Sequence, residues 1–362
     1  MPPRDVIVIG ASAGGVEALR TLVAELPSDL PAAVLVALHV PASGHSALPR
    51  ILRRAAALPC EHALDRQRLE PGRIYVAPPD QHLLVVDDEL HLSRGPRENG
   101  YRPAVDVLFR SAARAHGSRV VAVVLSGALD DGAAGANVVC ARGGMLLVQD
   151  PEDALYPGMP SNALAVCSPE LVGTAAELGR ELARLAGTEA PERSDPVLRD
   201  LRMETAMAEL DPTALDDPDR PGRPSGLTCP DCQSGLFELP GEQVRYRCRV
   251  GHAWTGISLL AQQDAGLEHA LWMALRSLEE KAALALRMAS SARQRSSERT
   301  AERYEQTAAD ATAATGTLRR LLLGQPALVG PETTEALDLA AVAPRGPAAF
   351  PVTSGERVPD DG

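Results

Sequence analysis

The 362-residue sequence predicts an α/β fold whose mostly parallel, doubly wound sheet has helices on both faces. Its first half contains short, β-branched apolar runs, which are typical of strands buried on both sides. Segments with helical spacing separate these runs, and regular alternation of this kind favours a parallel sheet. The predicted strands are residues 6–10, 32–40, 73–78, 119–127 and 144–150, the predicted helices are 16–26 and 132–143, and a hairpin turning at Asp87-Asp88 is predicted over 82–93.

Composition changes after residue 187, where a stretch rich in Pro, Asp and Arg begins. Such a stretch is typical of a linker, here with a short helix near residues 197–210. We therefore predict five parts: an α/β domain over 1–187, a linker over 188–226, a small cysteine-bearing unit over 227–256, a helical hairpin over 257–324 that breaks near 290–297, and a disordered tail over 325–362.

The predicted helical hairpin carries an apolar stripe at helical spacing. The stripe consists of Leu260, Leu267, Leu271, Ala274, Leu275 and Leu278. It is either a packing face within the hairpin or a face that binds a partner protein, and the sequence does not separate the two.

The overall charge argues against a nucleic-acid binder. The formal net charge is −12 and only 3% of the residues are aromatic, whereas proteins that bind nucleic acids usually have basic surfaces and aromatic residues for stacking. No apolar run is long enough to span a bilayer, and no secretory signal precedes the first strand. We expect a protein of the cytoplasm without direct membrane insertion; the oligomeric state stays open.

Gly10-Ala11-Ser12-Ala13-Gly14 matches the pattern G-x-S-x-G at a strand-to-helix turn. A sharp turn there lifts a serine hydroxyl above the carboxyl edge of the sheet, and the following helix offers backbone N–H groups to a developing oxyanion. Two other interpretations remain at this point: a dinucleotide-binding turn and a structural glycine turn. The second strand ends in His39 rather than in the acidic residue that a dinucleotide site needs.

Two further side chains follow predicted strands. His39 ends the second strand, and Asp130 and Asp131 come just after the strand at 119–127. Because the carboxyl ends of parallel strands open into one crevice, an alcohol, an imidazole and a carboxylate are expected to meet there as nucleophile, base and orienting group. Spacing does not choose between the two aspartates, and either could instead cap the next helix.

Residues 5–185 resemble the catalytic domain of the chemotaxis protein-glutamate methylesterases, the CheB family. Six blocks carry the resemblance in the same order: 9–19, 39–41, 71–83, 99–109, 125–135 and 156–164. The resemblance implies a triad of Ser12, His39 and Asp131, since the family's aspartate stands immediately before a glycine. It also implies hydrolysis of glutamate γ-methyl esters on a chemoreceptor-like signalling protein with release of methanol, and in some members deamidation of glutamines. No cofactor is expected for catalysis.

Three positions depart from the family pattern. Ala13 replaces a usual threonine, Leu38 a glutamine and Ala128 a methionine. The family's chemotaxis members also carry a receiver domain before the esterase, whereas here Met1 lies close to the first strand, so we expect control to come from the C-terminal half or from a partner. Two alternatives to an active esterase are a catalytically weak or inactive signalling scaffold of the same fold and a nucleotide-binding protein.

Cys229, Cys232, Cys248 and His252 form the pattern C-x₂-C…C-x₃-H. Three thiolates and one imidazole are the ligand set of a closed structural zinc site, and a unit of this size needs such a metal to fold. We predict a zinc ribbon with bound Zn²⁺ in a structural or protein-docking role; unrelated reduced cysteines and a redox pair are the alternatives. The other three cysteines, Cys60, Cys140 and Cys167, are predicted to be free thiols.

Overall fold

The computed structural model describes residues 1–43, 46–192, 199–215, 217, 222–241 and 243–323. The chain divides into two compact units, Met1–Leu267 and the part from Glu268 onward. The predicted tail over 325–362 lies outside the described residues, and the predicted domain boundaries stay predictions.

The centre of the first unit is a seven-stranded sheet in the order β10-β9-β8-β1-β2-β5-β3, in which every neighbouring pair is parallel. The strands are β1 (Val6–Ala11), β2 (Ala33–Leu38), β3 (Cys60–His62), β5 (Ile74–Val76), β8 (Val120–Val124), β9 (Met145–Gln149) and β10 (Leu171–Gly173). The predicted fold class is therefore confirmed. Since β1 lies between β2 and β8, the loops after these three strands meet at one sheet edge.

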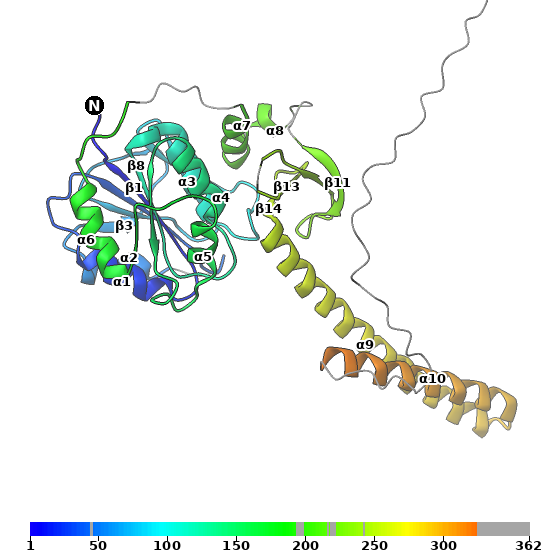
Figure 1. Ribbon diagram of the computed structural model, residues 1–362. Coiled ribbons are helices and arrows are strands. Elements are labelled where there is room, and N and C mark those ends of the chain that lie inside the picture. Colours follow the sequence, from blue (N-terminus) through cyan, green and yellow to red (C-terminus); the bar gives the residue numbers. More distant parts are fainter. Residues whose placement is uncertain (44–45, 193–198, 216, 218–221, 242, 324–362) are drawn as a thin grey trace, which may run out of the picture. The chain divides into compact units, whose positions relative to one another are not determined.

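Helices cover both faces of this sheet (Figure 1). Side chains alternate along β1, so that Ile7 and Ile9 pack in one core and Val6 and Val8 in the other. One core is closed by α1 (Gly15–Ala24), α2 (Leu48–Ala55) and α6 (Ala175–Leu185), and the opposite core by α3 (Val105–His116), α4 (Ala133–Ala141) and α5 (Gly158–Leu164). A short 3₁₀ turn, η1 (Gly117–Arg119), leads from α3 into β8.

A second, three-stranded sheet consists of β4 (Gln67–Arg68), β7 (Glu89–Ser93) and β6 (His82–Val86). Strands β6 and β7 form the predicted hairpin, and Asp87 takes a left-handed conformation in its turn, with a φ of 52°. The prediction of a hairpin turning at Asp87-Asp88 is thus confirmed.

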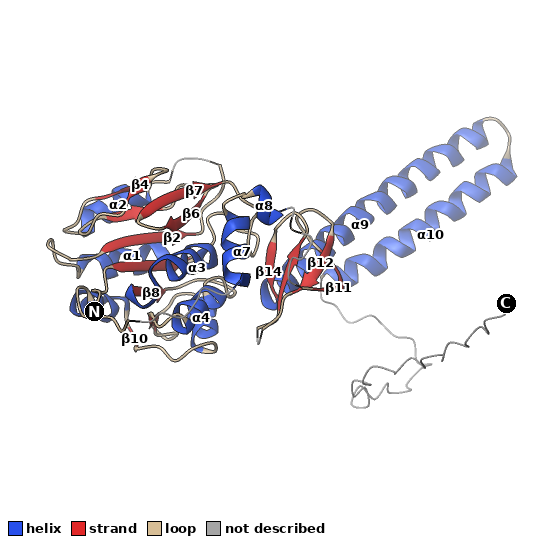
Figure 2. Cartoon of the chain, turned by 90° about the horizontal axis from the view of Figure 1, so that it is seen from above, coloured by secondary structure: helices blue, strands red, loops and turns tan. Residues whose placement is uncertain are grey.

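After the α/β part come two short helices, α7 (Arg199–Ala208) and α8 (Pro212–Leu215), and an antiparallel sheet. The sheet contains β11 (Arg223–Thr228), β12 (Gly235–Glu238), β13 (Arg245–Cys248) and β14 (Ala253–Thr255), in that order (Figure 2). We call residues 223–255 the ribbon; it belongs to the first compact unit.

Two long helices follow, α9 (Gly256–Gln294) and α10 (Glu298–Leu322), and the break between them falls in the predicted region. Small side chains are buried between the helices, namely Ala285, Ala289, Ala292, Ala301, Ala308 and Ala311. Of the predicted apolar stripe, Leu275 is buried, whereas Leu260 and Leu267 are exposed. The stripe is therefore not a continuous packing face. Among the described helices, none is both long and apolar enough to cross a membrane.

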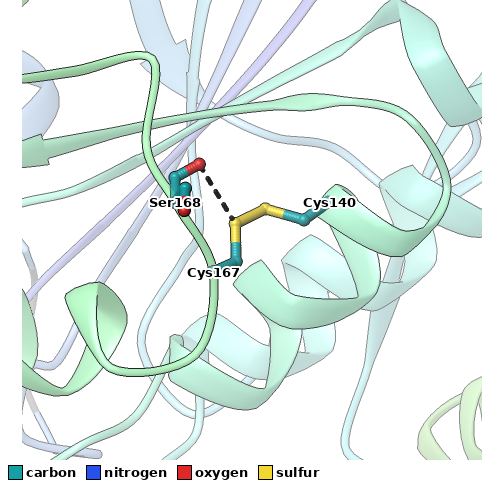
Figure 3. The surroundings of a disulfide bond; sticks show 3 residues. All are labelled: Cys140, Cys167 and Ser168. Atoms are coloured by element: carbon teal, nitrogen blue, oxygen red, sulfur yellow. Dashed lines mark hydrogen bonds between the residues drawn. A yellow bond between two sulfur atoms is a disulfide. The ribbon is translucent and has the colours of Figure 1, made fainter.

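The structure joins Cys140 and Cys167 in a disulfide between α4 and the segment after α5 (Figure 3). The prediction that both are free thiols is wrong. The two cysteines are 27 residues apart, and no sequence spacing signals such a pair. The Sγ atom of Cys167 also lies 3.7 Å from the carbonyl oxygen of Ser168. Cys60 is a buried free thiol, as predicted.

Candidate active site and metal-ligand cluster

Ser12, His39 and Asp131 contact one another above the sheet edge. The Oγ atom of Ser12 lies 3.0 Å from Nδ1 of His39, and Nε2 of His39 lies 2.7 Å from Oδ2 of Asp131. The side chains of His39 and Asp131 are only 4% and 1% exposed. With its proton on Nε2, the imidazole donates to Asp131 and leaves Nδ1 to accept the Ser12 proton. The arrangement supplies a nucleophile, a base and an orienting carboxylate.

Both carboxylate oxygens of Asp131 accept hydrogen bonds. Its Oδ2 also accepts the N–H of Val105 at 2.7 Å, and its Oδ1 accepts the N–H of Asp106 at 3.2 Å and Nδ2 of Asn99 at 3.1 Å. Burial raises the pKa of Asp131, but the hydrogen bond and charge of His39, together with the two backbone amides, hold it below its ordinary value. Asp131 therefore stays ionised beside His39.

Asp106 lies next to Asp131, but its pKa is shifted in the opposite direction. Burial and the neighbouring Asp131 charge raise the pKa of Asp106 to about 8. Asn99 bridges the two carboxyl groups, because its Nδ2 also donates to Oδ2 of Asp106 at 3.2 Å. Two buried carboxyl groups this close titrate as a pair that holds on to a proton.

The serine opens into a cavity of about 500 Å³. The lining includes Ser12, His39, Arg97, Tyr101 and Arg102. The Tyr101 ring stacks on the imidazole of His39, with centroids 3.6 Å apart and planes 8° apart, which limits rotation of the imidazole. Two arginines line the cavity beside the nucleophile: Arg102 is paired with Asp80 at 2.6 Å, and Arg97 adds a further positive charge.

Close backbone packing shapes the turn around Ser12. A Cβ atom on Gly127 would lie 2.9 Å from Cβ of Ser12 and 2.0 Å from Sδ of Met159. A Cβ on Gly10 would lie 2.1 Å from Cγ1 of Val105. Only glycine fits at these two positions without displacing a neighbour. The N-terminus of α1 follows Ser12 by three residues, and its positive dipole end favours negative charge there.

The three departures from the family pattern lie in different surroundings. Ala13 lines the cavity, Leu38 is buried in the core beneath α1, and Ala128 follows Gly127 in the loop after β8. Leu38 therefore contributes apolar packing where an amide would need a hydrogen-bond partner.

Cys229, Cys232, Cys248 and His252 place four potential metal-ligand atoms within 4.8 Å of one another. The sulfurs of Cys232 and Cys248 are 3.7 Å apart, and Sγ of Cys248 is 3.5 Å from Nδ1 of His252. Tetrahedral zinc with Zn–S bonds of about 2.3 Å holds two sulfurs about 3.8 Å apart. The four residues therefore fit a single metal ion of this kind.

Three functional candidates were not foreseen from the sequence, Asn99, Thr255 and Ser258. Asn99 donates to Asp131, while the hydroxyls of Thr255 and Ser258 donate to Oδ1 of Asp130 at 2.8 and 2.6 Å. Asp130 therefore faces the first turn of α9, whereas His39 contacts Asp131. The neighbours of Asp130 come from more than 120 residues away, which no local motif reveals.

The α/β part of the chain is similar to known proteins. A family model described as CheB methylesterase matches residues 7–182. Over 193 residues, the chain is 37% identical to "Protein-glutamate methylesterase/protein-glutamine glutaminase 2" of Methanosarcina acetivorans, which covers 51% of this chain and 54% of that protein. Over 169 residues, it is 35% identical to a "Putative protein-glutamate methylesterase/protein-glutamine glutaminase" of Leptospira interrogans, which covers 46% of this chain and 88% of that protein.

Among solved structures, the chain is similar to the Thermotoga maritima CheB methylesterase catalytic domain. That structure is 30% identical, matches 51% of this chain and 100% of its own, and gives a TM-score of 0.49. The chain spans about half the length of several curated relatives that it matches. Since the Leptospira relative is matched over most of its own length and the family model covers the same region, the chain belongs to the CheB methylesterase family.

Proposed function

We propose that the chain is a serine hydrolase that demethylates glutamate γ-methyl esters on a signalling protein. The observation that carries the proposal is the continuous contact from Ser12 through His39 to Asp131, buried at one end and open to a cavity at the other. The names of the relatives supply the substrate class, protein glutamate methyl esters, with glutamine side chains as a second acyl substrate.

In the proposed mechanism, Oγ of Ser12 attacks the ester carbonyl carbon while Nδ1 of His39 takes the hydroxyl proton. Asp131 holds the imidazole in place and stabilises its positive charge, which a lowered pKa of the carboxyl group favours. The tetrahedral intermediate collapses, and His39 gives its proton to the leaving methoxide, so that methanol departs and an acyl-Ser12 ester remains. Water, deprotonated by His39, then releases the glutamate carboxyl group and restores Ser12.

Access for a protein substrate is consistent with the open cavity beside Arg97 and Arg102. A substrate segment with acidic side chains near the methylated glutamate would be attracted by the Arg97 guanidinium at the mouth. No metal takes part in these steps. We propose that Cys229, Cys232, Cys248 and His252 hold a structural Zn²⁺, which would stabilise the fold of the ribbon.

Methanol release from a methylated receptor fragment tests the proposal. The wild-type chain should release methanol, and Ser12→Ala should not, while both keep the same unfolding midpoint. A fluorophosphonate probe followed by peptide mass spectrometry should label Ser12 in the wild type. Labelling at another residue, or equal methanol release by Ser12→Ala, would contradict the mechanism. Absence of both labelling and methanol release in the folded wild type would favour the inactive scaffold, for which the departures at Ala13, Leu38 and Ala128 are the reason.

The structural metal is tested separately. Purified protein should contain about one zinc ion per chain, and Cys229→Ser should lower that ratio. Cys60→Ser is the matched control, since Cys60 is a buried thiol of β3 outside the cluster. A zinc content that is unchanged in Cys229→Ser would refute the assignment of the ligands.

A further inference from the structure

The last strand of the ribbon lies directly against a loop of the active site. The N–H of Asn99 donates to the carbonyl oxygen of Ala253 at 2.8 Å, and the N–H of Ala253 donates to that of Arg97 at 3.3 Å. The N–H of Thr255 then donates to Oδ1 of the Asn99 side chain at 2.9 Å. Strand β14 is thus joined by backbone hydrogen bonds to the segment that carries Asn99.

The bond from Thr255 determines which way the Asn99 amide faces. An asparagine amide has an accepting oxygen at one end and a donating nitrogen at the other. Because the Thr255 N–H occupies the oxygen, the nitrogen faces the carboxyl groups of Asp131 and Asp106. The reverse orientation would direct the amide oxygen at the ionised Asp131 carboxylate in a site where Asn99 is only 5% exposed, so water could not relieve the repulsion.

Thr255 also holds the residue that precedes Asp131 in the chain. Its hydroxyl donates to Asp130 at 2.8 Å and accepts the N–H of Ser258 at 3.1 Å, which caps the start of α9. The Ser258 hydroxyl donates to the same Asp130 oxygen. One ribbon residue therefore contacts both supports of the Asp131 loop, the Asn99 amide and the Asp130 carboxylate.

The metal-ligand cluster lies directly beside β14. His252, one of its four residues, immediately precedes β14, and the apolar core of the ribbon is small, with Leu236, Trp254 and Leu259 packed beside the thiols. A core of this size does not fold a ribbon without help, so the ion would supply the missing stability.

A second connection runs through buried charges. Arg247, which neighbours Cys248, donates to Glu98 at 3.1 Å and to Glu204 of α7 at 2.9 Å. Glu98 in turn pairs with Arg110 of α3 at 2.6 Å and directly precedes Asn99. Loss of Arg247 from this position would leave carboxylates buried with fewer partners, which makes the docked ribbon the favoured state.

We propose that the metal-loaded ribbon is a working part of the esterase site, in which Thr255 and Asn99 are positioning residues for Asp131. The inference rests on the proposed function, since it assigns these residues a role in that reaction. Metal binding to the cluster orders β14, the Thr255 N–H orients the Asn99 amide, and the amide keeps Asp131 aligned with His39. The rate of ester hydrolysis therefore depends on metal occupancy at a site that touches no substrate.

The first experiment removes the metal from the full chain with a chelator and restores it with Zn²⁺. Zinc content, methanol release, the rate of fluorophosphonate labelling of Ser12 and hydrogen exchange of residues 97–106 are followed together. On zinc loss we expect kcat and the labelling rate to fall at least tenfold and exchange in 97–106 to rise, all reversed by Zn²⁺. Cys232→Ala should reproduce the metal-free state, and Cys60→Ala should not.

The second experiment holds the zinc content constant and changes the positioning residues. Asn99→Ala removes one donor to Asp131, and a lost hydrogen bond of typical strength corresponds to about a tenfold lower kcat with little change in KM. Asn99→Asp directs an oxygen at Asp131 and should be slower still. Thr255→Val keeps the N–H that orients Asn99 and loses only the hydroxyl that binds Asp130, so kcat should fall less than in Asn99→Ala, and Thr255→Ser should restore it. In Asn99→Ala, zinc removal should cause a smaller further loss than in the wild type.

The outcomes separate this inference from the proposed function. A folded, zinc-loaded wild type that neither releases methanol nor reacts at Ser12 would defeat the proposed function. An active wild type whose kcat stays within twofold after zinc removal, or in zinc-loaded Asn99→Ala, would defeat the coupling and leave the esterase intact. If zinc removal unfolds the whole chain, the variants with constant zinc content decide the matter.

Discussion

Asp106 and Asp131 cap each other's helices. Asp131, which precedes α4, accepts the N–H groups of Val105 and Asp106 at the start of α3. Asp106, in the first turn of α3, accepts the N–H groups of Gly132 and Gly135 at the start of α4, at 3.0 and 2.6 Å. The exchange binds the two helices together at the point where Asp131 meets His39. The orientation of the imidazole is therefore built on the packing of α3 against α4.

Asp131→Asn is expected to lower kcat by about 10³- to 10⁴-fold, because an amide cannot both accept from His39 and stabilise its positive charge. Asp130→Asn keeps an oxygen that accepts from Thr255 and Ser258, so its kcat should fall by about tenfold or less. Steady-state kinetics on a methyl ester substrate compares the two. Equal losses in both variants would remove the reason for choosing Asp131.

Asp106→Ala is expected to reduce the free energy of unfolding by about 2–4 kcal/mol, since it removes the acceptor for two N–H groups of α4 and leaves them buried. Asp106→Asn retains an acceptor oxygen toward Gly132 and Gly135 and should cost less. Urea unfolding followed by circular dichroism measures both. A cost below 1 kcal/mol in Asp106→Ala would show that water or a rearranged loop replaces the cap.

His82 should make the fold sensitive to acid. Burial lowers the pKa of His82 to about 4, and the neutral ring donates to the carbonyl of Pro96 and accepts the N–H of Ala104. Because the folded pKa lies below the unfolded value, the stability that depends on neutral His82 is complete above pH 6.5 and is lost as pH falls toward 4. The full effect is about 3 kcal/mol.

Unfolding free energies measured between pH 4 and 7.5 check this prediction against His82→Gln, which cannot titrate there. The wild type should lose more stability than the variant over that range, even though His116, whose pKa burial also lowers, titrates in both. Parallel pH profiles for the two proteins would mean that His82 is protonated without cost.

Gly10→Ala should destabilise the chain by about 1–3 kcal/mol, because its Cβ would meet Cγ1 of Val105 at 2.1 Å. Val105→Ala removes those Cγ atoms and makes room for the new Cβ. The double variant Gly10→Ala with Val105→Ala should therefore lose less stability than the two single variants lose together. Thermal unfolding of the four proteins completes the cycle. Additive losses would show that the turn moves instead of the side chain.

Much of the α/β part is readable from the chain because buried parallel strands leave apolar runs in the sequence. The strands before Ser12, His39 and Asp131 are such runs, but only the structure shows that β1 lies between β2 and β8. Spacing alone left Asp130 and Asp131 equivalent. The structure separates them, because His39 contacts Asp131, whereas the Ser258 hydroxyl of α9 donates to Asp130.

Other features have no local signature. The disulfide between Cys140 and Cys167 contradicts the expectation of free thiols, because pairing depends on the distance between a helix and a loop rather than on spacing. The apolar stripe on α9 predicted a face at helical period, but Leu275 is buried and Leu267 is exposed, because periodicity alone does not say which turns of a helix are covered.

The sequence by itself determined the alternation of buried strands and helices, the serine turn, and the spacing of the four potential metal ligands, because each is encoded by neighbours in the chain. Only the tertiary structure decided that Thr255 meets Asn99 and that the ribbon contacts the support of Asp131. Those contacts join residues 156 positions apart, and they exist because buried polar groups must find partners when the elements pack.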